Sequence, residues 1–226
     1  MPADRRCFLT AVSAATLGSA VFPSTTRAQR VAVGETDHPA PISTKYDVAW
    51  ADRITARFRA VFDSPNMTGG AALIRANAWC DQYKEVYGVE RAAMNAVLVL
   101  RADAIDLAVD DDYWQRFKVG KEHTLRGADG KRWTTVNPIS ARSHDAEPSI
   151  PANTLESFMA NGGIVLACGW AFGKVIQRYG DGDRLDRAEA ARVARSHLIP
   201  GIVLQPNGIF AVLRAQEAGC HFVAAS

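Results

Sequence analysis

Short apolar runs alternate with longer amphipathic stretches along most of this chain. Five runs are apolar enough for strands covered on both faces: residues 59–62, 96–100, 164–168, 202–204 and 220–224. Between them, the spacing of apolar positions predicts helices over residues 69–87, 153–160, 169–179, 187–197 and 209–218. This alternation predicts a three-layer α/β domain built on a five-stranded parallel sheet.

Two stretches depart from the alternation. Residues 29–44 hold Gly34, Pro39, Pro41 and Ser43 without periodicity, so we expect an N-terminal arm or linker over residues 29–56. Residues 101–152 are mixed and largely polar, and an insertion of this length is typical of functional or disordered segments. The expected α/β domain therefore covers residues 57–226, with an insertion at about 101–152.

The first 28 residues predict a twin-arginine signal peptide. Arg5 and Arg6 precede a weakly apolar stretch over residues 8–22, and small residues follow up to Ala28. The stretch is about 15 residues long, whereas a bilayer span takes roughly 20, so we expect no stable membrane anchor. The alternative is an uncleaved amphipathic helix. Cleavage would place the working protein in the periplasm.

Charge argues against nucleic acid as a partner. The whole chain has 26 Lys and Arg against 24 Asp and Glu. Loss of residues 1–28 would remove three arginines and one aspartate, which leaves a formally neutral protein. Binding driven by the release of counterions from phosphates therefore has no support in the composition.

Three cysteines lie beyond the expected cleavage site: Cys80, Cys168 and Cys220. Ligands of open parallel sheets bind beyond the carboxyl ends of the strands, and Cys168 ends a predicted strand there. The helix that follows would offer unpaired amides to a thiolate. The alternative is that Cys168 is a small apolar core residue. Cys80 and Cys220 are expected near the opposite end of the sheet, away from the carboxyl ends of the strands. If a disulfide forms, they are therefore the least implausible pair.

Other strand ends and the insertion supply candidate binding residues. Arg101, Trp170 and Asn207 follow predicted strands, and Asp112 and Trp114 lie in the insertion, where they could line a pocket over the sheet edge. The alternatives are a solvated acidic turn for Asp112 and a hydrophobic clasp for Trp114. No dinucleotide, P-loop or nucleophile-elbow motif follows a strand, and the histidines lack metal-ligand spacing, so no cofactor or metal is expected.

Several tracts together resemble the DsrE/DsrF-like family of sulfur-relay proteins. The tracts are Ile164–Cys168, Leu198–Val203, Asn207–Ile209 and Leu213–Gly219. The segments around Leu100–Arg101, Asp111–Trp114 and Phe117–Gly120 look like an exported branch of that family. The resemblance covers roughly residues 57–225, and it implies a flavodoxin-like or DsrE-like five-stranded parallel sheet and a homo-oligomer.

The resemblance also implies a chemical role for Cys168, because relay members carry a persulfide on the matching cysteine. We therefore expect an exported protein that binds or relays a small sulfur species through Cys168, with a small sulfur compound or a sulfur-carrier protein as its partner. Arg101 and the helix start would attract an anionic sulfur compound. The alternative is a non-catalytic periplasmic module for ligand binding or oligomeric interaction; whether the protein is an enzyme is left open.

Overall fold

The five strands of the computed structural model form one parallel sheet, which confirms the predicted α/β fold class. The structure describes residues 41–127, 129–141 and 153–226. The strands are β1 (Phe58–Ser64), β2 (Met94–Leu100), β3 (Ile164–Cys168), β4 (Val203–Gln205) and β5 (His221–Ala224). Their order across the sheet is β4-β3-β2-β1-β5, which differs from the 2-1-3-4-5 order of flavodoxin itself.

The helices lie close to the positions that the sequence predicts. They are α1 (Ala71–Tyr87), α2 (Asp111–Phe117), α3 (Val119–Glu122), α4 (Leu155–Ala160), α5 (Gly169–Asp183), α6 (Arg187–Ser196) and α7 (Gly208–Glu217). Four short 3-10 helices are η1 (Ala49–Arg53), η2 (Thr68–Gly70), η3 (Arg91–Ala93) and η4 (Ala102–Ala108). Side-chain caps and glycines determine where several helices begin and end. Thr154 caps α4 through its side chain, and Gly88, in a left-handed conformation with φ 65°, ends α1.

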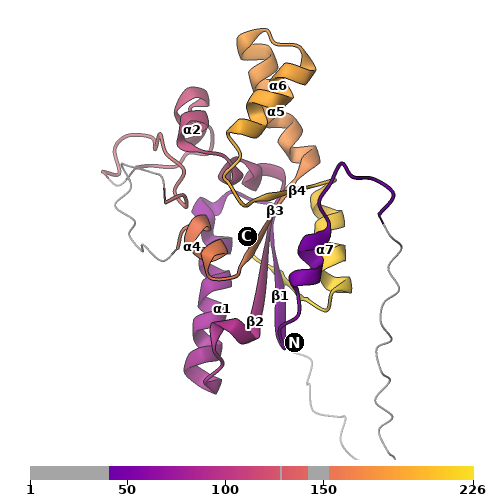
Figure 1. Cartoon of the computed structure of the whole chain (residues 1–226). Helices are drawn as coiled ribbons and strands as arrows, with labels where there is room; N and C mark the ends of the chain where they lie inside the picture. Colours follow the sequence, from indigo (N-terminus) through magenta and orange to yellow (C-terminus); the bar gives the residue numbers. More distant parts are fainter. Residues whose placement is uncertain (1–40, 128, 142–152) are drawn as a thin grey trace, which may run out of the picture. The chain divides into compact units, whose positions relative to one another are not determined.

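The strand order decides which helix covers which face. The chain moves in one direction from β1 to β4 and then returns past β1 to β5. Because parallel crossovers are right-handed, this reversal sends α7 to the opposite face from the earlier helices. Figure 1 shows α1 and α4 on one side of the sheet and α7 on the other.

Two hydrophobic layers follow from this arrangement. Alternate residues of each strand point to opposite faces, so Leu98 packs in the layer of α1, α4 and α5, whereas Val97 and Val99 pack in the layer of α7. Trp50 of η1 is buried in the α7 layer at 2% exposure. The domain therefore begins earlier than the expected residue 57, because the end of the predicted arm contributes to the core.

Residues 101–127 and 129–141 of the insertion contain more helix and more buried positions than their polar sequence predicts. Every residue from Ala104 to Val109 is buried, and α2, α3 and a bridge between Arg126 and Trp133 follow. The predicted signal peptide, residues 29–40 of the predicted arm and residues 142–152 of the insertion lie outside the described residues. Within the described part of the chain, none of the helices combines the length and hydropathy that crossing a membrane requires.

Candidate functional site

The carboxyl ends of β3 and β4 form a point at which the topology switches. Cys168 at the end of β3 pairs in register with Gln205 at the end of β4. From there α5 packs into the layer of α1, and α7 packs into the opposite layer. Open α/β sheets bind ligands where neighbouring strands lead to opposite faces. Cys168 therefore occupies the position in the fold that is most often used for ligands.

Cys168 caps α5 with its side chain. Its Sγ accepts a hydrogen bond from the backbone N–H of Ala171 at 3.4 Å, and the residue is 6% exposed. The positive end of a 15-residue helix favours negative charge on this sulfur. Gly169 allows the close approach of the two strand ends, because a Cβ there would lie 2.6 Å from the carbonyl oxygen of Gln205.

The other two thiols lie in packed layers away from a helix start. Cys80, Cys168 and Cys220 are all free. Cys80 on α1 packs on one face of the sheet, whereas Cys220 packs on the other, so the sheet separates them. The structure therefore does not contain the Cys80–Cys220 disulfide, which the sequence left open as the least implausible pair. Burial raises the pKa of each of these two thiols to about 11, which keeps them protonated at neutral pH.

Arg101 lies at the same edge of the sheet as Cys168 but is engaged by a carboxylate. Its Nε and Nη2 each donate to Asp63 at 2.7 Å, in a bidentate pair. The pKa of Arg101 is raised mainly by this hydrogen bond, and the negative charge of Asp63 acts in the same direction. Its side chain also passes close to Gly208 at the start of α7. Arg101 is thus near Cys168, with much of its charge balanced by Asp63.

The remaining predicted residues fall into different settings. Trp170, in the first turn of α5, is 75% exposed beside Cys168. Asn207 caps α7 by accepting from the N–H of Phe210 at 2.8 Å. Asp112 is exposed on α2, close to Asp110 and His197. Each of these three side chains has an atom that could coordinate a metal ion, and the three atoms lie within 4.8 Å of one another.

Trp114 is a core residue, which corrects the expectation that it lines a binding pocket. It has no exposed surface, and its indole N–H donates to the carbonyl oxygen of Asp106 at 2.6 Å. The structure therefore agrees with the alternative interpretation of Trp114 as part of a hydrophobic cluster. The sequence alone could not distinguish the two, because the insertion has no clear periodicity.

A buried ionic network near α5 was missed at the level of the sequence. Asp106 of η4 has no exposed surface. Its Oδ2 lies 2.9 Å from Nε2 of His123 and accepts from Nζ of Lys174 at 3.1 Å, and its Oδ1 accepts from the hydroxyl of Tyr113 at 3.2 Å. The sequence does contain one indication of this network. Lys174 and Arg178 are spaced by four residues on a helix that is otherwise largely apolar on its inner face.

The network is balanced in charge without an added ion. Glu122 pairs with both Lys174 and Arg178, and Arg178 also approaches Asp106 at 3.8 Å. Asp106, Glu122 and His123 could offer ligand atoms to a metal. The two cations already neutralise the two carboxylates there, so a cation would have to displace them. The network is better suited to fixing α5, the helix that starts at Cys168, against η4 and α3.

Comparison with known proteins adds no relative to this picture, because no family model and no curated protein matches the chain. The functional interpretation therefore rests on the geometry around Cys168 and on the chemistry of the residues beside it.

Proposed function

We propose that this protein accepts a sulfane sulfur atom on Cys168 and holds it as a persulfide, as expected of an exported DsrE-like protein. The observation that carries the proposal is the place of Cys168, which caps α5 where β3 and β4 lead to opposite faces of the sheet. Cys80 and Cys220 serve as an internal contrast, because burial raises the pKa of both thiols and neither caps a helix.

The proposed chemistry is a transfer between sulfur atoms. The Cys168 thiolate attacks the outer sulfur of a hydropersulfide or polysulfide donor, and a new S–S bond forms on Cys168. The S–S bond of the donor breaks, and its electron pair leaves with the donor thiolate or the shortened polysulfide. No external oxidant is needed. The backbone N–H of Ala171 would stabilise the thiolate before the attack.

The exposure of Cys168 sets the size of the donor. At 6% exposure the sulfur can be reached by a small polysulfide anion more easily than by a bulky reagent. We therefore propose small sulfur species as the direct donors, and a sulfur-carrier protein only where it can present an extended, terminal persulfide.

The test is mass spectrometry of the intact mature protein after incubation with polysulfide and removal of excess donor. We expect the mass of one added sulfur atom, mapped to Cys168 and removed by a thiol reductant. Cys168→Ser should abolish the addition, and Cys220→Ser, which removes another buried thiol, should leave it unchanged. Equal loading of all three cysteines, or unchanged loading in Cys168→Ser, would overturn the proposal.

Export is a separate part of the proposal and rests on the sequence around Arg5 and Arg6. Fractionation of cells that express the full chain should place a processed protein in the periplasm, with a new N-terminus near residue 29. Arg5→Lys combined with Arg6→Lys should retain the unprocessed protein in the cytoplasm. An unprocessed chain in the wild type would contradict export.

A second candidate function, association between two copies of the chain, is favoured by apolar side chains that face solvent near the site. Ile209 and Leu213, on successive turns of α7, are 61% and 53% exposed. Exposed apolar clusters of this kind are common at interfaces. Sedimentation analysis should show a dimer, and Leu213→Glu should dissociate it. A monomeric wild-type protein would contradict this function and would leave the persulfide proposal unaffected.

A further inference from the structure

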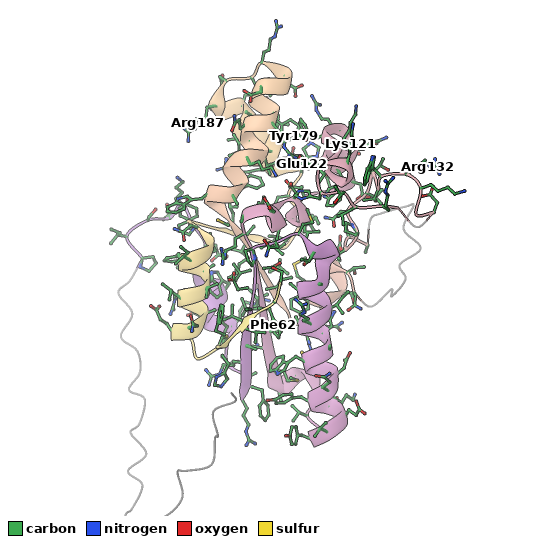
Figure 2. All side chains as sticks on the ribbon, turned by 180° about the vertical axis from the view of Figure 1, so that it is seen from behind. Phe62, Lys121, Glu122, Arg132, Tyr179 and Arg187 are labelled. Atoms are coloured by element: carbon green, nitrogen blue, oxygen red, sulfur yellow. The ribbon has the colours of Figure 1, made fainter. Side chains whose placement is uncertain are left out.

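The insertion holds a basic hollow that none of the predicted site residues line. One wall comes from the α2–α3 junction and α3, and the other from the segment that follows α3. The lining side chains that matter here are Lys118, Lys121, Arg126, Lys131, Arg132 and Trp133. Figure 2 shows Lys121 and Arg132 on the same side of the molecule, away from Arg187 of α6. We propose that this hollow binds a ligand through a phosphate or sulfate group.

Basic side chains outnumber acidic ones within residues 118–135, around the hollow. Lys118, Lys121 and Lys131 are exposed, and the structure describes neither a hydrogen bond nor an ion pair for any of their ammonium groups. Residues 118–135 contain two acidic side chains, and both are engaged elsewhere. Glu122 pairs with Lys174 and Arg178. Asp129 pairs with Arg132 at 2.9 Å. Within residues 118–135 neither carboxylate pairs with the three lysines, which therefore contribute a local positive potential.

One cation of the hollow, the guanidinium of Arg126, is fixed in place. The guanidinium carbon of Arg126 lies 3.6 Å from the ring centroid of Trp133, which is a close cation–π contact. Nη1 of Arg126 also donates to the carbonyl oxygen of Lys131 at 2.6 Å. A guanidinium held in this way keeps other N–H donors for a ligand, and its planar fork matches the oxygens of a phosphate or sulfate.

The backbone on either side of α3 is constrained around the hollow. Lys118 and Thr124, on either side of α3, both take left-handed φ angles, 53° and 55°. Such angles are costly for residues other than glycine and persist where the surroundings impose them. Gly120 of α3 lies directly against Thr134, because a Cβ at residue 120 would be 2.1 Å from the carbonyl oxygen of Thr134. α3 and Thr134 are thus in close contact before any ligand binds.

These observations favour a ligand with at least two negative charges on tetrahedral oxyanion groups. Phosphate and sulfate esters share this chemistry, and several flexible ammonium groups around one fixed guanidinium can contact several oxygens at once. A single monovalent anion would gain little from such an arrangement in water, because each exposed charge pair is weak and is screened by salt.

The experiment is isothermal titration of the processed protein with inorganic pyrophosphate and, separately, with a sulfated disaccharide, at low and at physiological ionic strength. We expect saturable binding of at least one probe, weakened by added salt. The stronger probe identifies the phosphate or the sulfate source. Lys118→Asn, which keeps a side chain that tolerates the left-handed conformation, should weaken binding about five-fold, and its combination with Lys121→Gln about 25-fold.

The matched control is Arg187→Gln, which removes a cation far from the hollow and should leave the affinity unchanged. Because Lys118 and Lys121 are exposed, thermal unfolding of their variants should match that of the wild type, which separates lost binding from lost folding. Absence of saturable binding for both probes would overturn the proposal, as would equal affinities of the wild type and the double variant. Sulfur loading of Cys168 is independent of either result.

Discussion

The buried carboxylate of Asp106 gives the sharpest test of what holds α5 in place. Asp106→Ala removes the partner of His123 and Lys174 and an acceptor of the Tyr113 hydroxyl, at a position with no exposed surface. Removing one member of a buried ion pair costs about 3–5 kcal/mol. Glu122 still contacts Lys174 at 2.9 Å, so we expect the lower end, about 3 kcal/mol.

Urea unfolding followed by circular dichroism measures this loss of free energy of unfolding. In thermal scans, about 3 kcal/mol corresponds to a fall of about 6–12 °C in Tm for a domain of this size. Asp106→Asn keeps the volume and one acceptor oxygen but loses the charge, so we expect about 2 kcal/mol. Glu189→Gln, on the exposed surface of α6, loses only an exposed ion pair with Arg192, so it should lower Tm by at most about 2 °C. A loss under about 1 kcal/mol for Asp106→Ala would refute the view that this carboxylate anchors α5.

Three further predictions concern the sheet edge and the thiols. Gly169→Ala would bring a Cβ within 2.6 Å of a backbone carbonyl of β4, so we expect a loss of about 1–3 kcal/mol in urea unfolding, together with slower sulfur loading. Asn207→Ala removes the cap of α7 and should cost about 1 kcal/mol, whereas Asn207→Asp should restore most of it; equal stabilities of the two variants would argue against the cap. Burial raises the pKa of Cys80 and Cys220 from 9.0 to about 11, so the unfolded chain releases these protons first. The free energy of unfolding should therefore fall between about pH 9 and about pH 11. In the double variant Cys80→Ala, Cys220→Ala, the free energy of unfolding should fall less between about pH 8 and about pH 11 than it does in the wild type.

The sequence predicted the elements well where a local pattern carries the information. The apolar run at 164–168 coincides with β3, and the caps and glycines near α1 and α4 set their ends within a residue or two. The edge that carries Cys168 and Arg101 also followed from the sequence, because the carboxyl ends of parallel strands share one edge. The polar insertion was the exception, since its burial depends on contacts that no local pattern records.

The sequence did not predict contacts between residues that are far apart along the chain. Asp106 and Lys174 are separated by 68 positions, and their contact depends on how α5 packs against η4. Trp114 could have been a pocket wall or a core residue until the position of α2 was known. The hollow around Arg126 and Trp133 likewise required the antiparallel bridge that brings these two residues together.

The thiols show most clearly what each level decides. The sequence by itself determined that Cys168 ends a strand and that Cys80 and Cys220 lie away from that end. Helices between parallel strands run antiparallel to them, and Cys220 begins its strand. Only the tertiary structure decided that Cys80 and Cys220 lie on opposite faces of the sheet. The physical reason is the handedness of the crossovers: the reversal of direction before β5 places α7 on the far face, and this reversal is set by the strand order across the whole sheet.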